Sequence, residues 1–301
     1  SIAALTVLDR LVITAHRAGC QSITIVCDGE MPPIPRARGL GIAPKITKKL
    51  PRISQRTLVA TVNLLVQEND VKTLLQGGGR LMTKGKKLLP IGVVRSLDGS
   101  LIQSLNKERR VMAEGLAMRV ADGFSSSAAE VELWDTMGSN TDGLVDKYFN
   151  RPTGRLLSKF LIHTAILPNH VSIAATVLGV WAAWWFSQVE PGNHMPAIIG
   201  ALLLQVSAVI DCVDGDLARI MFKESKLGKW LDIVGDQVVH MTLFICIAVG
   251  LAHAKPEVSA VVLGVSAAVG VLIAFGVVLR GMLHQNARGN TRLQRLIDAT
   301  T

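Results

Sequence analysis

The chain changes character near its middle, where mixed apolar and polar segments give way to long apolar runs. Four stretches are nearly free of charge and reach about 20 residues, the length that a helix needs to cross a membrane. They cover residues 171–189, 196–210, 231–251 and 258–279. The second stretch continues directly into an acidic sequence that begins at Asp211. We therefore predict an α-helical membrane domain with four transmembrane helices in the second half of the chain.

The first part of the chain reads as a mixture of helices and strands. Apolar residues recur at helical spacing over residues 2–15, and a β-branched strand pattern follows over residues 22–27. Two more β-branched runs cover residues 58–66 and 91–94. This pattern predicts an α/β domain over residues 1–124.

A connector and a basic helix separate the two predicted domains. Residues 125–147 are rich in Ser, Asp, Thr and Gly, which is typical of a connector. The membrane domain, residues 148–301, opens with a helical pattern in which Arg151, Arg155 and Lys159 alternate with apolar residues. Such a helix can lie at a membrane surface, and its basic face is predicted to contact lipid headgroups.

The loops between the predicted spans indicate how the chain crosses the membrane. Lysines and arginines collect in loops that face the cytoplasm. Lys223, Lys226 and Lys229 follow the second span, several arginines follow the fourth, and the other two turns share one lysine. We predict an integral protein of the cytoplasmic (inner) membrane, with the N-terminal domain and the acidic sequence on the cytoplasmic side.

Composition and charge narrow the function further. The 49% hydrophobic content fits a membrane protein, and the net charge of +9 fits anionic lipids or a phosphorylated substrate. Only 4% of the residues are aromatic and no basic run is interleaved with them, so nucleic acid is not an expected partner. The four cysteines form no C-x-x-C pair, which argues against a zinc site or a disulfide framework.

The acidic sequence between the second and third spans carries the candidate chemistry. Asp211 and Asp214 are three residues apart, and Asp232 and Asp236 are four apart, so each pair shares one face of a helix. Carboxylates at membrane depth are costly and would repel one another without a cation. A ligand set of carboxylates favours Mg²⁺, Mn²⁺ or Ca²⁺ over zinc. The pattern therefore predicts a divalent metal centre that binds a diphosphate.

Small and basic residues accompany these carboxylates. Gly215 and Ala218 leave room for a nucleotide or a pyrophosphate to approach the backbone, and Arg219 can bind a phosphate oxygen. Gly228 would permit close approach of another helix.

The sequence from Asp211 to Asp236 follows D-x2-D-G-x2-A-R-x8-G-x3-D-x3-D and resembles the signature of the CDP-alcohol phosphotransferase (CDP-alcohol phosphatidyltransferase) family, with every fixed position present. The sequences around Pro152 and Pro168 are similar to the family's entry into its juxtamembrane helix and first span. The resemblance implies that Asp211, Asp214 and Asp232 hold the metal together with Asp236. It also implies that Asp236 is the general base that deprotonates the acceptor hydroxyl.

The same resemblance implies a cofactor, a nucleotide site and an assembly. Mg²⁺ or Mn²⁺ is the implied cofactor, and the family fold has six transmembrane helices, usually in a homodimer. Four of the six fit in this chain, so we expect it to be truncated at both ends. The residues implied to hold the CDP moiety are Asp211, Gly215, Ala218, Arg219 and Gly228.

The N-terminal domain is similar to a nucleotidyltransferase-like domain fused to some family members. These include proteins that join an inositol-1-phosphate cytidylyltransferase to a di-inositol-phosphate-phosphate synthase. The glycine-rich, basic loop that such domains place before their first helix is not found in the sequence, and Asp70 is a weak stand-in for their metal-binding aspartate. No activity is assigned to this domain.

The predicted function is metal-dependent transfer of a substituted phosphate group from a CDP-alcohol to an acceptor alcohol, with release of CMP, in phospholipid or inositol-phosphodiester biosynthesis. The implied donors are CDP-diacylglycerol or CDP-inositol, and the acceptors are of the inositol phosphate or glycerol phosphate type. Analogy with the fused proteins favours inositol chemistry. The alternative is a catalytically inactive membrane scaffold or a divalent-cation-binding membrane protein, which would release no CMP.

Overall fold

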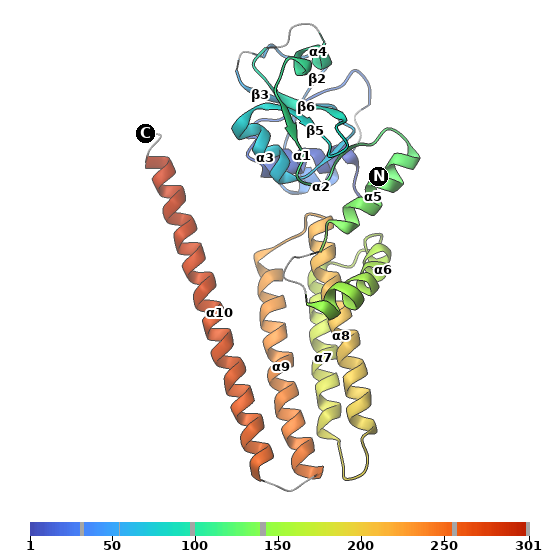
Figure 1. Ribbon diagram of the computed structural model, residues 1–301, viewed down its shortest axis with the longest axis vertical. Coiled ribbons are helices and arrows are strands. Elements are labelled where there is room, and N and C mark those ends of the chain that lie inside the picture. Colours follow the sequence, from blue (N-terminus) through green and yellow to red (C-terminus); the bar gives the residue numbers. More distant parts are fainter. Residues whose placement is uncertain (31–32, 54, 97–99, 139–142, 255–257, 299–301) are drawn as a thin grey trace. The chain divides into compact units, whose positions relative to one another are not determined.

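The computed structural model describes residues 1–30, 33–53, 55–96, 100–138, 143–254 and 258–298 (Figure 1). Its contacts divide the chain into two compact units. The first unit holds Ser1–Thr141 and Ile220–Phe222, and the second holds Asp142–Arg219 and Lys223–Thr301. The limits at residues 124 and 148 that the sequence suggests stay predictions.

The first unit is an α/β structure, which confirms the predicted class. Its described helices are α1 (Val7–Arg17), α2 (Pro35–Gly39), α3 (Glu68–Gly77), α4 (Leu101–Asn106) and α5 (Gly123–Asp135). Its described strands are β1 (Thr24–Val26), β2 (Lys45–Thr47), β3 (Thr57–Ala60), β4 (Leu64–Val66), β5 (Gly79–Met82), β6 (Leu88–Val94), β7 (Arg110–Met112) and β8 (Ala117–Arg119).

The strands form one four-stranded sheet and two smaller ones. The larger sheet has the order β3-β6-β5-β7, in which β5 and β7 are parallel and the other pairs are antiparallel. The pairs β1-β2 (parallel) and β4-β8 (antiparallel) form the small sheets. The apolar run over residues 58–66 is divided between β3 and β4, which belong to different sheets. Thr61 and Asn63 mark the break, where the Thr61 hydroxyl donates to the Asn63 side chain.

Helix α1 lies between two hydrophobic clusters of the first unit. Leu11 packs with apolar residues of the larger sheet and of α3, while Leu8, Val12 and Ile13 pack with a second cluster around β1 and α2. The predicted helical pattern began at residue 2, but the helix begins at Val7. Thr6 caps it by accepting a hydrogen bond from the Asp9 backbone.

Two charged side chains of α1 are buried because the backbone supplies their partners. The Asp9 carboxylate accepts hydrogen bonds from the backbone N–H groups of Arg36 (3.0 Å) and Ala37 (2.7 Å) at the start of α2. The Arg10 guanidinium donates to the carbonyl groups of Ile2 and Ala3. Burial lowers the pKa of Arg10 to about 10, against the opposing effects of Glu130 and Asp9. Arg10 stays charged at neutral pH and holds the N-terminal segment.

Asp70 has a similar structural role at the start of α3. Its buried carboxylate accepts hydrogen bonds from the backbone N–H groups of Glu114 (2.8 Å) and Gly115 (3.3 Å) in the loop between β7 and β8. Asp70→Ala should lower the local stability by about 1–3 kcal/mol, because it leaves two partly buried backbone N–H groups without their acceptor. Hydrogen exchange of the β7 and β8 amides should therefore become about tenfold faster or more.

Glu68 offers a matched control on the same helix. Its carboxylate makes an exposed ion pair with Lys72 (2.6 Å). Such pairs contribute only about 0.3–0.5 kcal/mol, so Glu68→Ala should leave the exchange of β7 and β8 nearly unchanged. Equal exchange rates in the two variants would show that Asp70 does not hold this loop.

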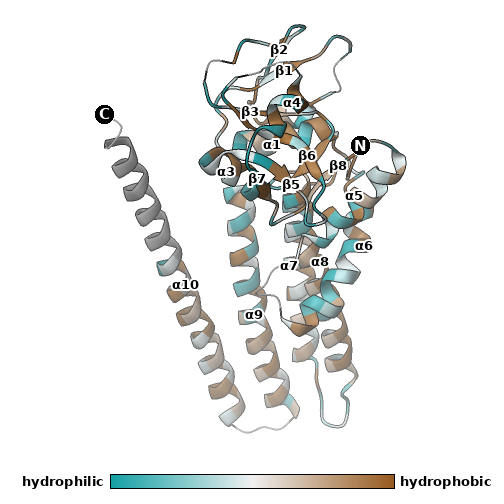
Figure 2. Ribbon diagram, turned by 45° about the horizontal axis from the view of Figure 1, so that its top comes forward, coloured by the Kyte–Doolittle hydropathy of each residue, from teal (hydrophilic) through white to brown (hydrophobic). Residues whose placement is uncertain are grey.

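The second unit is helical and contains the membrane domain. Its described helices are the π-helical turn η1 (Asp146–Asn150), α6 (Arg151–Leu161), α7 (Pro168–Ser187), α8 (Met195–Ile220), α9 (Lys226–Ala254) and α10 (Val258–Asp298). Among the residues that the structure describes, four segments are long and apolar enough to cross a membrane, which confirms the four predicted spans: Pro168–Ser187, Met195–Ile220, Lys226–Ala254 and Ser259–Gly281. Figure 2 shows hydrophobic residues along most of α7, α8 and α9.

Helix α6 presents its apolar side outward. Leu156 and Phe160 are 71% and 69% exposed, whereas Gly154 and Ser158 are buried. Gly154 permits this packing, because a Cβ atom there would lie 3.2 Å from the Val209 carbonyl oxygen of α8. The exposed apolar face is suited to insertion into the membrane surface.

Candidate active site

Three of the predicted aspartates converge within the second unit. Asp211 and Asp214 lie one turn apart on α8, and Asp232 lies in the second turn of α9. One carboxylate oxygen of each lies within 4.8 Å of the others. Asp214 is buried, and Asp211 and Asp232 are half-buried. The structure thus brings together three carboxylates that are up to 21 positions apart in the sequence.

Asp236 lies one turn further along α9. Its side chain is exposed, and it is not part of the group of three among the residues that the structure describes. Its charge nevertheless interacts with the charges of Asp211 and Asp232. A fourth, accessible carboxylate therefore stands beside the three convergent ones, and its predicted roles as metal ligand and general base stay predictions.

The convergent oxygens fit a hard divalent cation. In an octahedral Mg²⁺ site, neighbouring ligand oxygens are about 3 Å apart and opposite ones about 4 Å. The separations of up to 4.8 Å are slightly larger than this, so small side-chain movements would bring all three oxygens into contact with one cation. The donors are carboxylates alone, which favours Mg²⁺ or Mn²⁺ over softer metals.

Arg219 folds back toward the acidic part of α8. A Cβ atom at Gly215 would lie 3.4 Å from its Nη2 atom, so the guanidinium passes over the glycine. Its charge also interacts with that of Asp232. Ala218, on the same turn of α8, is half-buried. The predicted phosphate-binding residues therefore border the three carboxylates.

Glycines of α9 allow α7 to come close beside the site. A Cβ atom at Gly228 would lie 2.9 Å from Asn169 Oδ1, and one at Gly235 would lie 2.4 Å from Thr176 Oγ1. The close approach at Gly228 matches the role suggested by the sequence. Gly235 was missed, although its position between Asp232 and Asp236 was a signal for a tight helix contact.

Gly235→Ala tests this contact. The added methyl group would overlap Thr176 Oγ1, and overpacking of this kind costs about 1–3 kcal/mol. We expect a lower melting temperature of the purified chain and weaker metal binding. The double variant Gly235→Ala/Thr176→Ala removes the overlapping oxygen and should recover most of the loss. A double variant as unstable as Gly235→Ala would contradict the proposed contact.

A buried ion pair corrects part of the sequence interpretation. Arg151 Nη1 lies 3.3 Å from Asp216 Oδ1, and the two side chains are only 13% and 1% exposed. Arg151 therefore points toward α8, and its predicted place on a headgroup-binding face is wrong. Asn150 supports the same junction, because its side chain accepts a hydrogen bond from Gln205 of α8. The missed signal was Asp216, a further carboxylate in the acidic sequence that follows the second predicted span.

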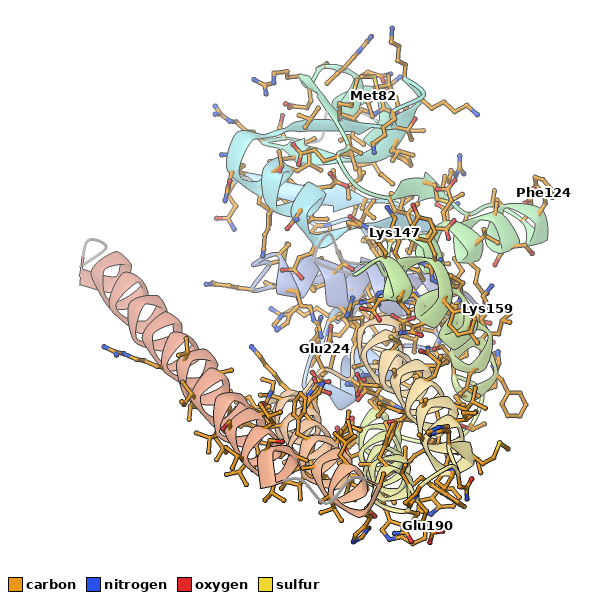
Figure 3. All side chains as sticks on the ribbon, turned by 60° about the horizontal axis from the view of Figure 1, so that its bottom comes forward. Met82, Phe124, Lys147, Lys159, Glu190 and Glu224 are labelled. Carbon is orange, nitrogen blue, oxygen red and sulfur yellow. The ribbon has the colours of Figure 1, made fainter. Side chains whose placement is uncertain are left out.

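Charged residues mark the two ends of the helices in this unit. Lys147, Lys159 and Glu224 lie toward one end, and Glu190 lies at the opposite end (Figure 3). Glu190 is exposed in the turn between α7 and α8. The aspartates of α8 and α9 belong to the end that carries Glu224, because the α8–α9 connection contains it.

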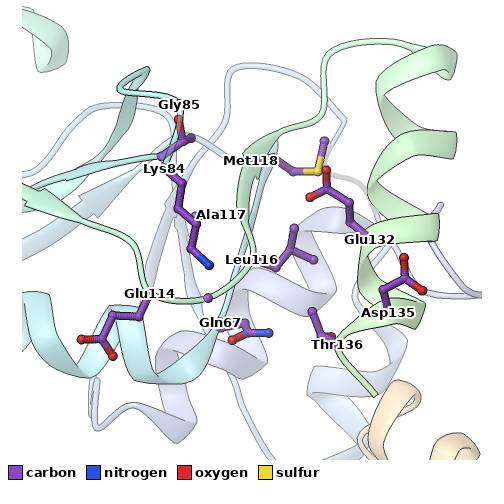
Figure 4. A pocket seen from close by; sticks show the side chains of 12 residues that line it. Gln67, Lys84, Gly85, Glu114, Leu116, Ala117, Met118, Glu132, Asp135 and Thr136 are labelled. Atoms are coloured by element: carbon purple, nitrogen blue, oxygen red, sulfur yellow. The ribbon is translucent and has the colours of Figure 1, made fainter. Parts of the chain in front are cut away.

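The first unit contains a separate open cavity of about 590 Å³. Figure 4 shows Lys84 on one side and Glu132 and Asp135 of α5 on the other, with Gln67 at its base. Gln67 packs closely against Gly115 at the base of the cavity: its Oε1 atom lies where a larger residue at position 115 would place its Cβ atom. Its mixed charges suit a polar ligand, and none of the predicted site residues lines it.

The candidate site lies in a segment of the chain that is similar to a known protein family. The family model for CDP-alcohol phosphatidyltransferases matches residues 165–297. This segment includes all the predicted site residues and the four apolar helices. The match and these helices together indicate an integral membrane protein. Proteins of this family generally use a divalent metal, which agrees with the convergent carboxylates.

Three curated relatives carry the name "Bifunctional IPC transferase and DIPP synthase". The protein from Aquifex aeolicus is 31% identical over 118 residues, which are 38% of this chain and 24% of that protein. The protein from Thermococcus kodakarensis is 30% identical over 98 residues, or 33% and 21%. The protein from Archaeoglobus fulgidus is 27% identical over 107 residues, or 36% and 20%. The matched stretches thus span a quarter or less of the relatives' length.

Proposed function

We propose that this chain, whose residues 165–297 match the family model for CDP-alcohol phosphatidyltransferases, transfers a substituted phosphate group from a CDP-alcohol to an acceptor alcohol and releases CMP. The observation that carries the proposal is the convergence of Asp211, Asp214 and Asp232 from two helices. The family signature and the carboxylate cluster coincide in the same residues.

Asp211, Asp214 and Asp232 would hold the cation, with Asp236 as a further ligand. We propose Mg²⁺ or Mn²⁺, the cofactor that the family resemblance implies, and the carboxylate oxygens of the cluster suit either cation. When bound, the cation would neutralise the diphosphate of the donor and stabilise the phosphate that leaves. Without it, the carboxylates would repel an anionic substrate.

The chain's own residues supply binding and proton transfer. Arg219 donates to a phosphate oxygen of the donor, and Gly215 and Ala218 let the diphosphate approach α8. Asp236, which is exposed, accepts the proton of the acceptor hydroxyl. The hydroxyl oxygen forms a bond to the β-phosphorus as the bond between that phosphorus and the CMP oxygen breaks. The products are a phosphodiester and CMP.

The donor CDP-alcohol and the acceptor alcohol are each proposed as a class of compound. The printed name of the relatives, "IPC transferase and DIPP synthase", favours an inositol-type substrate. We propose CDP-inositol or CDP-diacylglycerol as donor, and an acceptor of the inositol phosphate or glycerol phosphate type, in phospholipid or inositol-phosphodiester synthesis. The outward apolar face of α6 would help a lipid alcohol to reach the site from the membrane.

The orientation and assembly are proposed as well. The α8–α9 connection carries Lys223, Lys226 and Lys229, which supports a cytoplasmic site in the inner membrane. The N-terminal unit would then lie on the same side. A homodimer is proposed by analogy with the family.

The test supplies the purified chain with each donor and a panel of acceptor alcohols in the presence of Mg²⁺ or Mn²⁺. Mass spectrometry of the products should reveal one phosphodiester for the correct pair, and none without an acceptor. A scaffold or a cation-binding membrane protein would give no product with any pair. That result would favour the alternative function, provided that the chain still bound Mn²⁺.

A further inference from the structure

Helix α7 forms one wall of the carboxylate cluster without contributing any signature residue. Ser172 lies in its second turn and is only 4% exposed. Its hydroxyl donates a hydrogen bond to Oδ2 of Asp214, which is itself only 7% exposed. A side chain outside the family signature thus contacts one of the three convergent carboxylates.

The proton of the Ser172 hydroxyl has two acceptors within reach. Oγ also lies 3.3 Å from the Pro168 carbonyl oxygen, one turn earlier on α7. A serine hydroxyl has a single proton, and an ionised carboxylate is the stronger acceptor. The hydroxyl therefore donates to Asp214, and the Pro168 carbonyl oxygen is the weaker of the two acceptors.

The position of Ser172 is fixed by the surrounding helix contacts. The Thr176 hydroxyl donates to the Ser172 carbonyl oxygen (3.0 Å) and packs against Gly235 of α9. One turn earlier, Asn169 packs against Gly228 at the start of α9. These two contacts hold α7 on either side of Ser172, so the hydroxyl has little freedom to move away from Asp214.

We propose that Ser172 is a positioning residue for the metal centre: it fixes the Asp214 carboxylate so that its remaining lone pairs face Asp211 and Asp232. This inference rests on the proposed function, because it assumes that the three carboxylates bind a cation. Groups that orient metal ligands in this way typically change metal affinity by about 10–100-fold when they are removed.

Ser207 provides a matched control between the same two helices. It is also buried, and its hydroxyl donates to the Ala175 carbonyl oxygen of α7 (2.8 Å). Ser207→Ala therefore removes a buried hydroxyl and one bond between α8 and α7, as Ser172→Ala does, but it leaves the carboxylates untouched.

The experiment measures Mn²⁺ affinity of the purified full chain in detergent, from the electron paramagnetic resonance signal of free Mn²⁺. Ser172→Ala should weaken Mn²⁺ binding by about 10–100-fold, and Ser207→Ala should change it less than about twofold. Ser172→Thr retains the hydroxyl and should bind Mn²⁺ within a few-fold of the wild type. Without metal, Ser172→Ala and Ser207→Ala should have similar melting temperatures.

Two results would overturn the inference. If Ser172→Ala bound Mn²⁺ as tightly as the wild type, Ser172 would not position Asp214. If Ser207→Ala weakened binding equally, the effect would come from helix packing. Failure of the proposed function gives a different result, because a wild type that bound no Mn²⁺ would remove the metal centre itself. No donor or acceptor alcohol is needed for any of these measurements.

Discussion

Replacing Asp232 with asparagine is expected to lower the rate of CMP release by about 10²–10³-fold. The substitution keeps the size of the side chain but removes the charge that α9 contributes to the cluster of three carboxylates. A divalent cation supplies several kcal/mol of charge stabilisation in such reactions, and each ~1.4 kcal/mol lost lowers the rate tenfold. Initial rates of CMP formation at saturating Mn²⁺ measure the effect.

Glu190→Gln is the matched control for Asp232→Asn. It also neutralises a carboxylate, but in the exposed turn at the opposite ends of α7 and α8 (Figure 3). We expect a rate within about twofold of the wild type, because surface substitutions away from special features have small effects. Similar losses of activity in the two variants would show that the charge of Asp232 has no special role.

The second large effect is expected from Arg151→Met, which removes the ion pair between Arg151 and the buried carboxylate of Asp216. Removing one partner of a buried pair costs about 3–5 kcal/mol. For a protein of this size, such a loss should lower the melting temperature by roughly 5–8 °C. Thermal unfolding of the purified chain in detergent measures the shift.

A second substitution separates the cost of losing the ion pair from the cost of losing the packing of the arginine side chain. In the double variant Arg151→Met/Asp216→Asn, the buried charge is gone, so we expect the melting temperature to recover by more than half of the loss. If the double variant is as unstable as Arg151→Met, the arginine stabilises the junction through its packing rather than through Asp216. If Arg151→Met melts like the wild type, the ion pair contributes nothing.

Much of the membrane domain could be predicted from the sequence because its signals are local. A transmembrane helix requires a long apolar run, and α7 to α10 each contain one. The convergence of Asp211, Asp214 and Asp232 could also be predicted, since residues three apart share a helix face and a short connection brings α9 back beside α8. The roles of the individual aspartates came from the family resemblance alone.

The contacts between helices could not be predicted in the same way. Ser172 is one of several small polar residues on α7, and its sequence neighbours do not indicate that it faces Asp214. The amphipathic pattern of α6 identified two faces but not which one packs inward. The buried pair of Arg151 and Asp216 decides this, and its members are 65 positions apart.

In the N-terminal unit, the ends of the strands could not be predicted, because the apolar pattern does not show where the chain turns. Residues 58–66 form a nearly continuous apolar run, yet the turn around Thr61 and Asn63 sends β3 and β4 to different sheets. Asp70 illustrates a related difficulty. Its carboxylate binds backbone N–H groups 44 and 45 positions away, so its role depends on tertiary structure.

The most direct test of the central claim is the stoichiometry and metal dependence of CMP release by the purified chain. We expect CMP and the phosphodiester to form in equal amounts from a CDP-alcohol and an acceptor alcohol. Both should stop when EDTA removes the metal and resume when Mg²⁺ or Mn²⁺ is restored. Undiminished CMP release in EDTA would contradict the assignment of Asp211, Asp214 and Asp232 as a catalytic metal centre. An absence of CMP with every donor, in a chain that binds Mn²⁺, would contradict the transferase function itself.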